Sequence, residues 1–135
     1  MDSRELLAFG TRYAIAWSSQ QPWSVAEFFS EDGSLQVNDD APAKGRAAIA
    51  GVAQGFLTAF PDMSVSMDEI EARPEGGVFH WTFTGTNTGP NGTGQRVRFS
   101  GYEEWTFGPD GLVADSKGHF DAEEYARQLE HGVSA

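Results

Sequence analysis

The strongest constraint on the fold is a pair of long segments in which apolar and polar side chains alternate. In residues 78–88 the side chains of Phe79, Trp81 and Phe83 share one face, and residues 95–107 alternate in the same way. A period of two is typical of a β-strand with one buried face. The intervening residues 87–94 contain four Gly and Pro residues. We therefore expect an antiparallel hairpin with an aromatic inner face.

The remaining segments predict helices before the hairpin and one helix after it. Apolar residues recur at helical spacing over residues 3–19 and 46–60, and Pro22 suits the first turn of a short helix. Short strands are expected at 35–37 and 65–71, with a turn at Asp32-Gly33 and a loop at 38–42. This order indicates an α+β fold, with helices packed on one face of a bent antiparallel sheet. No repeat or linker divides residues 1–135, so we expect a single domain.

Composition excludes several classes of function. The chain has no cysteine, which excludes disulfides and thiolate chemistry, and its net charge of −11 argues against nucleic acid or an anionic membrane as partner. The N-terminal residues lack the pattern of a signal peptide, so we expect a cytoplasmic protein. An apolar small molecule is the expected partner. A sheet surface rich in threonine suggests a homodimer.

Glu103 lies on the apolar face of the second alternating segment. A carboxylate buried there has to be paired, protonated or exposed to a cavity. Alternatively, a β-bulge shifts the alternation and returns Glu103 to solvent.

His119 and Asp121 are two residues apart at the end of an extended segment, so their side chains would project from the same face. If that face lines a cavity, the pair can transfer protons. If it does not, Asp121 caps the following helix, because residues 121–124 match a capping box. The two roles are compatible, since a carboxylate has several acceptor sites.

Aromatic and amide side chains complete the predicted pocket. Tyr13 could donate a hydrogen bond to a ligand oxygen, and aromatic walls would exclude water. The predicted substrate-binding residues are Tyr13, Trp17, Asn38, Phe56, Trp81, Phe83, Asn87 and Trp105, with turn or loop roles as the alternative for the two asparagines. The three histidines, His80, His119 and His131, have no zinc-binding spacing, so no metal is expected.

Several motifs resemble the SnoaL-like polyketide cyclases of the nuclear-transport-factor-2-like superfamily. These are Ala59-Phe60-Pro61-Asp62, Gly85-Thr86-Asn87-Thr88-Gly89, Phe120-Asp121 and the segment 128–132. The resemblance implies a cone in which a strongly curved antiparallel sheet wraps around N-terminal helices, leaving an apolar pocket. It also implies catalysis without cofactor or metal, with Asp121 as general acid/base in an intramolecular aldol closure.

Two departures from the family pattern matter. The usual Gly-Thr-His-Thr-Gly has Asn87 in place of the histidine, and the loop after it is short.

In the related ketosteroid isomerases, the tyrosine and the protonated acid of the oxyanion hole correspond to Tyr13 and Glu103. Their base, however, aligns with Val37, and Asp39 reaches that position only with a two-residue shift.

The leading hypothesis is a general acid/base enzyme that acts on an apolar carbonyl compound, as a polyketide cyclase or an isomerase. Asp121 with His119 would remove a proton, and Glu103 or Tyr13 would stabilise the enolate oxygen. One alternative is an epoxide hydrolase or epoxide-opening cyclase, although Arg98 lies on the wrong strand face for it. The other is a dimeric protein that binds a small ligand without catalysis.

Overall fold

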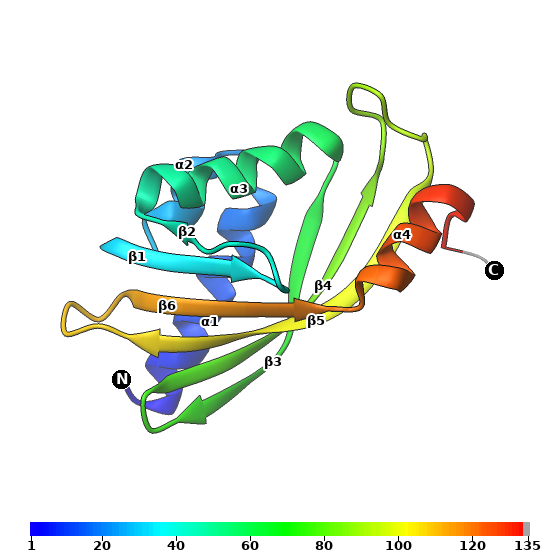
Figure 1. Ribbon diagram of the computed structural model, residues 1–135. Helices are drawn as coiled ribbons and strands as arrows, with labels where there is room; N and C mark the ends of the chain where they lie inside the picture. The colour runs from blue at the N-terminus through cyan, green and yellow to red at the C-terminus, as the bar shows by residue number, and fades with distance from the viewer. Residues whose placement is uncertain (134–135) are drawn as a thin grey trace.

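The computed structural model describes residues 1–133, which form helices and one curved sheet (Figure 1). The elements in chain order are α1 (Ser3–Ser18), α2 (Pro22–Ala26), β1 (Phe29–Val37), β2 (Ala43–Lys44), α3 (Arg46–Ala59), β3 (Ser64–Arg73), β4 (Gly76–Thr86), β5 (Arg96–Phe107), β6 (Val113–Phe120) and α4 (Ala122–His131). The expected α+β architecture, with N-terminal helices and a short C-terminal helix, is confirmed.

The sheet has six strands in the order β2-β1-β6-β5-β4-β3. Strands β3 to β6 form the expected antiparallel meander, whereas β1 pairs with β6 in parallel. Helix α1 packs against β3, α3 packs against β1, and α4 contacts β5. In Figure 1 the sheet bends around the helices, so its inner face and α1 and α3 enclose the interior.

The turn predicted at Asp32-Gly33 is wrong, because β1 continues through these residues. The strand instead contains an irregularity: Phe29 pairs with Val113 and Ser34 with Asp115, so β1 has extra residues between two contacts with β6. A side chain at Gly33 would place its Cβ 2.9 Å from the carbonyl oxygen of Val113. The glycine therefore permits close packing of β1 on β6 rather than a turn.

The pairing of β4 with β5 is continuous from Gly76 opposite Thr106 to Thr86 opposite Arg96. No bulge interrupts it near Glu103, which lies opposite Phe79. The bulge alternative is therefore excluded. Glu103 is on the inner face with only 7% of its surface exposed.

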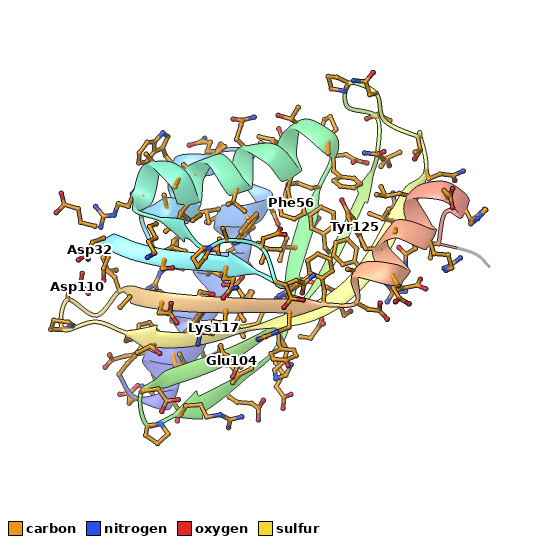
Figure 2. The ribbon with its side chains drawn as sticks, in the orientation of Figure 1. Asp32, Phe56, Glu104, Asp110, Lys117 and Tyr125 are labelled. Atoms are coloured by element: carbon orange, nitrogen blue, oxygen red, sulfur yellow. The ribbon has the colours of Figure 1, made fainter. Side chains whose placement is uncertain are left out.

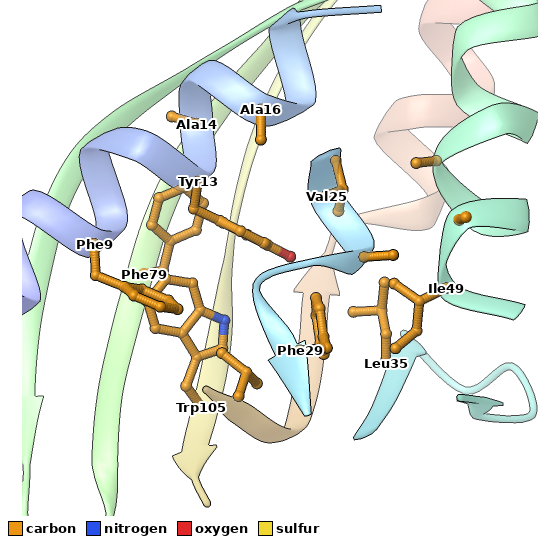
Figure 3. Packing of buried hydrophobic residues seen from close by; sticks show 14 of the residues in the cluster. Phe9, Tyr13, Ala14, Ala16, Val25, Phe29, Leu35, Ile49, Phe79 and Trp105 are labelled. Carbon is orange, nitrogen blue, oxygen red and sulfur yellow. The ribbon is translucent and has the colours of Figure 1, made fainter. Parts of the chain in front are cut away.

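Aromatic rings from α1, β4 and β5 form the core around Tyr13 (Figure 3). The Tyr13 ring meets Phe79 and Trp105 edge to face at centroid distances of 5.2 and 5.1 Å. Phe79 and Trp105 stack on each other at 5.1 Å. These contacts dock α1 on the sheet and place the Tyr13 hydroxyl in the interior, with the residue fully buried.

We predict that Gly101→Ala destabilises the protein by about 1–3 kcal/mol, as overpacking does. The new Cβ would overlap the carbonyl oxygen of His119 on β6 and lie 2.5 Å from the Trp81 indole. Gly51→Ala in α3 is the matched control, because its Cβ would have no atom within 4 Å. That variant should be more stable by about 0.5–1 kcal/mol. Urea denaturation measures both, and equal effects would contradict the packing at Gly101.

Candidate functional site

An apolar cavity of about 60 Å³ lies between α1, α3 and the inner face of the sheet. Almost all of its lining is aliphatic or aromatic: Trp17, Leu35, Val37, Phe56, Val65, Phe79, Trp81, Phe83, Phe99, Glu103, Gly118 and Phe120. Within residues 1–133, Glu103 is the one lining residue with a titratable side chain. Any acid/base chemistry in this cavity therefore centres on Glu103.

Three donors from three elements hold one oxygen of Glu103. The Tyr13 hydroxyl of α1 donates to Oε1 at 2.9 Å, the Trp105 indole N–H of β5 at 3.0 Å, and the Ser116 hydroxyl of β6 at 2.7 Å. Such an arrangement fixes the orientation of the carboxyl group and leaves little rotational freedom.

Burial raises the pKa of Glu103 above its ordinary value, because the charged form loses its hydration. The hydrogen bonds from Trp105, Ser116 and Tyr13 act in the opposite direction and lower the pKa, but desolvation is the larger effect. Burial also raises the pKa of Tyr13, and the nearby charge of Glu103 raises it further. Tyr13 is therefore a hydrogen-bond donor throughout the physiological range.

The second oxygen, Oε2, has no hydrogen bond from any side chain or backbone group of the described residues. Since Oε1 is occupied by donors, the proton of the neutral acid belongs on Oε2. Glu103 lines the cavity, so we infer that this proton is presented to whatever occupies it. The site can donate a hydrogen bond or a proton to an oxygen of a bound molecule.

Two of the lining residues, Trp17 and Trp81, carry a buried polar group. The indole N–H groups of Trp17 and Trp81 are buried and have no hydrogen-bond partner of good geometry in the described chain, although Trp17 interacts weakly with the Tyr13 hydroxyl. Buried donors without a partner are rare, since each costs about 1–3 kcal/mol.

Of the predicted substrate-binding residues, Trp17, Phe56, Trp81 and Phe83 line the cavity. Tyr13 and Trp105 do not line it but lie behind Glu103 and bind its carboxyl group. Figure 2 shows Phe56 below α3 and Tyr125 on α4, at the end of the sheet that α4 covers. These two side chains mark the end of the interior nearest to that helix.

The two asparagines hold loops and are not among the cavity-lining residues. Asn38 has a left-handed backbone with φ of 51°, and its Oδ1 accepts from the Phe120 N–H at 2.9 Å. Asn87 donates to the Ala59 carbonyl at 3.1 Å and accepts from the Thr93 N–H at 2.8 Å. Both therefore take the loop role that was the alternative.

His119 lies on the outer face of the sheet, where its Nε2 is 2.7 Å from Glu104 Oε1. Asp121 is exposed and caps α4, accepting from the N–H groups of Glu123 at 3.0 Å and Glu124 at 3.1 Å. The Glu124 side chain accepts hydrogen bonds from Arg127, so it does not complete a capping box. The structure thus brings neither His119 nor Asp121 into the cavity lining. The catalytic role of Asp121 stays a prediction from the family resemblance.

Several residues at the cavity were not predicted from the sequence. The cavity is also lined by Leu35, Val37, Val65, Phe79, Phe99, Gly118 and Phe120. Alternation placed Phe79 and Phe99 on the inner faces, so a signal existed for both. No pattern pointed to Ser116, because its contact with Glu103 arises from the pairing of β5 with β6.

A family model described as SnoaL-like polyketide cyclase matches residues 8–129. The chain belongs to the SnoaL-like polyketide cyclase family. No curated protein matches the sequence.

Solved structures share the fold over nearly the whole chain. A protein with a ketosteroid isomerase-like fold from Catenulispora acidiphila, in complex with trimethylamine, has a TM-score of 0.80 at 13% identity, covering 95% of this chain and 94% of its own. TsrD from Streptomyces laurentii has a TM-score of 0.81 at 16% identity, with 96% and 97% covered. A candidate SnoaL-like polyketide cyclase from Jannaschia has a TM-score of 0.80 at 15% identity, with 94% and 92% covered. At these identities the similarity establishes the fold alone.

The helices within residues 1–133 are all too short or too polar to cross a membrane.

We predict that Glu103→Gln makes this SnoaL-like protein relatively more stable as the pH rises. The pKa of Glu103 is raised in the folded state. Its contribution to the free energy of unfolding is therefore fully present below the unfolded pKa of about 4.3, and it is lost as the pH rises through the folded pKa. Glutamine keeps the acceptor for the three donors but does not ionise. Between the unfolded and the folded pKa, the difference in unfolding free energy between variant and wild type should grow by about 1.4 kcal/mol for each pH unit, and it should level off above the folded pKa.

Urea denaturation from pH 4 to 8 measures this difference. Glu31→Gln, at an exposed residue of β1, is the control and should show no such trend. A pH-independent difference for Glu103→Gln would contradict a raised pKa.

Proposed function

We propose that the protein is a general acid/base enzyme that acts on an apolar carbonyl compound, as a polyketide cyclase or isomerase does, with Glu103 as the proton-transfer group. One observation carries the proposal. Within the described chain, Glu103 is the one titratable residue lining the apolar cavity, and its Oε1 is held by donors while Oε2 is free.

The chemistry follows from these contacts. A substrate carbonyl oxygen near Oε2 accepts the proton of the neutral acid as an enol forms, and the Glu103 carboxylate that remains is stabilised by Tyr13, Trp105 and Ser116. The aromatic walls exclude water, which strengthens these interactions. The base that removes the α-proton is the predicted Asp121 or, for a 1,3-proton shift, the Glu103 carboxylate that forms when the acid has given its proton to the carbonyl oxygen.

The size of the cavity limits the substrate. A cavity of about 60 Å³ is small, because sites for drug-sized ligands measure roughly 300–1,000 Å³. A single ring fits more readily than a fused polycycle, which enters only after aromatic side chains such as Phe56 or Trp17 move.

The alternatives have less support. Epoxide opening by an aspartate–arginine–aspartate cluster needs a cation beside the carboxylate, and no arginine of residues 1–133 lines the cavity. Arg98 is exposed, and its backbone groups bond to Gln128. A protein that binds a small ligand without catalysis could use the same cavity, and the exchange experiment below distinguishes it from an enzyme.

We predict that the wild-type protein accelerates exchange of the α-hydrogens of cyclohexanone or acetophenone for deuterium, and that Glu103→Gln lowers the accelerated rate about 10²- to 10⁴-fold. Proton NMR in D₂O follows the exchange. Glu104→Gln is the matched control, because Glu104 is the next residue of β5 and is exposed. It should keep the wild-type rate.

Asp121→Asn tests the base predicted from the family. Asparagine is as good an N-cap as aspartate, so the helix is preserved and any loss of rate reports the carboxylate itself. Loss of exchange in Asp121→Asn with full activity in Glu103→Gln would contradict the proposal. Saturable binding of the ketones without exchange in the wild-type protein would favour a binding protein.

A further inference from the structure

A second cluster of chemically active side chains lies on the outer face of the sheet, opposite the cavity. Glu69 and Glu71 of β3 and His80 of β4 each offer one ligand atom, and these atoms all lie within 4.8 Å of one another. We propose that these three residues bind one divalent transition-metal ion, with zinc as the expected occupant.

A β-bulge creates this cluster. Met67 pairs with Trp81, whereas Glu69 pairs with His80, so β3 contains one extra residue, Asp68, between the two pairs. Without it, alternation would direct Glu69 to the same inner face as Met67. The bulge resets the alternation, so that Glu69 and Glu71 both point outward on the side of His80.

The distances are close to those of a metal site. His80 Nε2 lies 2.6 Å from Glu71 Oε2 and 4.0 Å from Glu69 Oε2. Tetrahedral zinc, with bonds of about 2.0–2.2 Å, places its ligand atoms roughly 3.3–3.5 Å apart. Both distances to His80 therefore have to change by less than about 1 Å, which rotation of these partly exposed side chains supplies.

The types of ligand favour a transition metal. Two carboxylates balance the charge of a dication, and an imidazole nitrogen discriminates against Mg²⁺ and Ca²⁺, which prefer oxygen. Arg73 lies 3.7 Å from Glu71 Oε1, whereas Oε2 is the oxygen that faces His80. The His80 ring is steadied by Tyr102, with a centroid distance of 5.8 Å. Water completes the coordination from the solvent side.

The same face provides a natural comparison. His119 lies 2.7 Å from Glu104, but no second carboxylate completes a set of three ligands there among the described residues. If histidine with one carboxylate were sufficient, both places would bind zinc. The proposal assigns binding to the His80 cluster because Glu69 supplies the third ligand. It is independent of the acid/base chemistry at Glu103.

Isothermal titration calorimetry with ZnCl₂ tests the site. Tag-free protein is first dialysed against EDTA and then against buffer with excess Mg²⁺, which occupies nonspecific carboxylate sites. We expect one zinc ion per wild-type chain. His80→Asn and Glu69→Gln should each weaken binding at least tenfold, and Glu69→Gln leaves the His80–Glu71 contact intact. His119→Asn should bind as the wild type does.

A thermal shift gives a second readout, since a ligand that binds only the folded state raises its melting temperature. Zinc should raise the melting temperature of the wild type and of His119→Asn but not of His80→Asn. Absence of saturable zinc binding to the wild type would overturn the proposal. So would full affinity in His80→Asn, or an equal loss of affinity in His119→Asn.

Discussion

The hydrogen bonds to Glu103 Oε1 join the first helix to the hairpin of β5 and β6. Tyr13 comes from the first helix, Trp105 from β5 and Ser116 from β6, and all three donate to one oxygen atom. Burying a carboxyl group among aromatic rings is costly, and these donors recover part of that cost. This one carboxyl group therefore links α1, β5 and β6 at the wall of the cavity.

The fold places the two oxygens of Glu103 in different surroundings. One oxygen is saturated by the protein, and the other has no partner in the described chain. Desolvation raises the pKa, so the neutral acid persists to a higher pH than for a glutamate in water. The aromatic core therefore both stabilises the domain and sets the protonation of its polar centre. The His80 cluster lies on the other face of the sheet, where exposed side chains form a separate site.

Local patterns in the sequence predicted much of this arrangement. Alternation placed Glu103 and the walls Trp81 and Phe83 on the inner face, and helical spacing placed Trp17 and Phe56 there as well. The parallel pairing of β1 with β6 was not predictable, because it joins segments with no local signal for each other. The contact of Ser116 with Glu103 follows from strand register, which single-strand patterns do not encode.

The same limit explains His119 and Asp121. Their spacing did not show which face of β6 His119 occupies. That became clear only when β6 was paired with β5: Ser116 and Gly118 lie on the inner side, so His119 points outward to Glu104, while Asp121 lies beyond the end of the strand and caps α4. Likewise, the bulge at Asp68 that brings Glu69 to His80 is a feature of pairing between strands. Spacing within one strand predicts which of its side chains share a face, and the pairing between strands determines what that face contacts.

The central claim is that Glu103 is a buried acid that stays neutral above the ordinary range of glutamate. Carboxyl carbon NMR of protein labelled with ¹³C-glutamate, with Glu103→Gln used to assign the resonance, measures its titration directly. The account predicts a midpoint above about 4.3, which rises further in Tyr13→Phe because that variant removes a hydrogen bond that favours the carboxylate. A Glu103 midpoint at or below about 4.3 would contradict it.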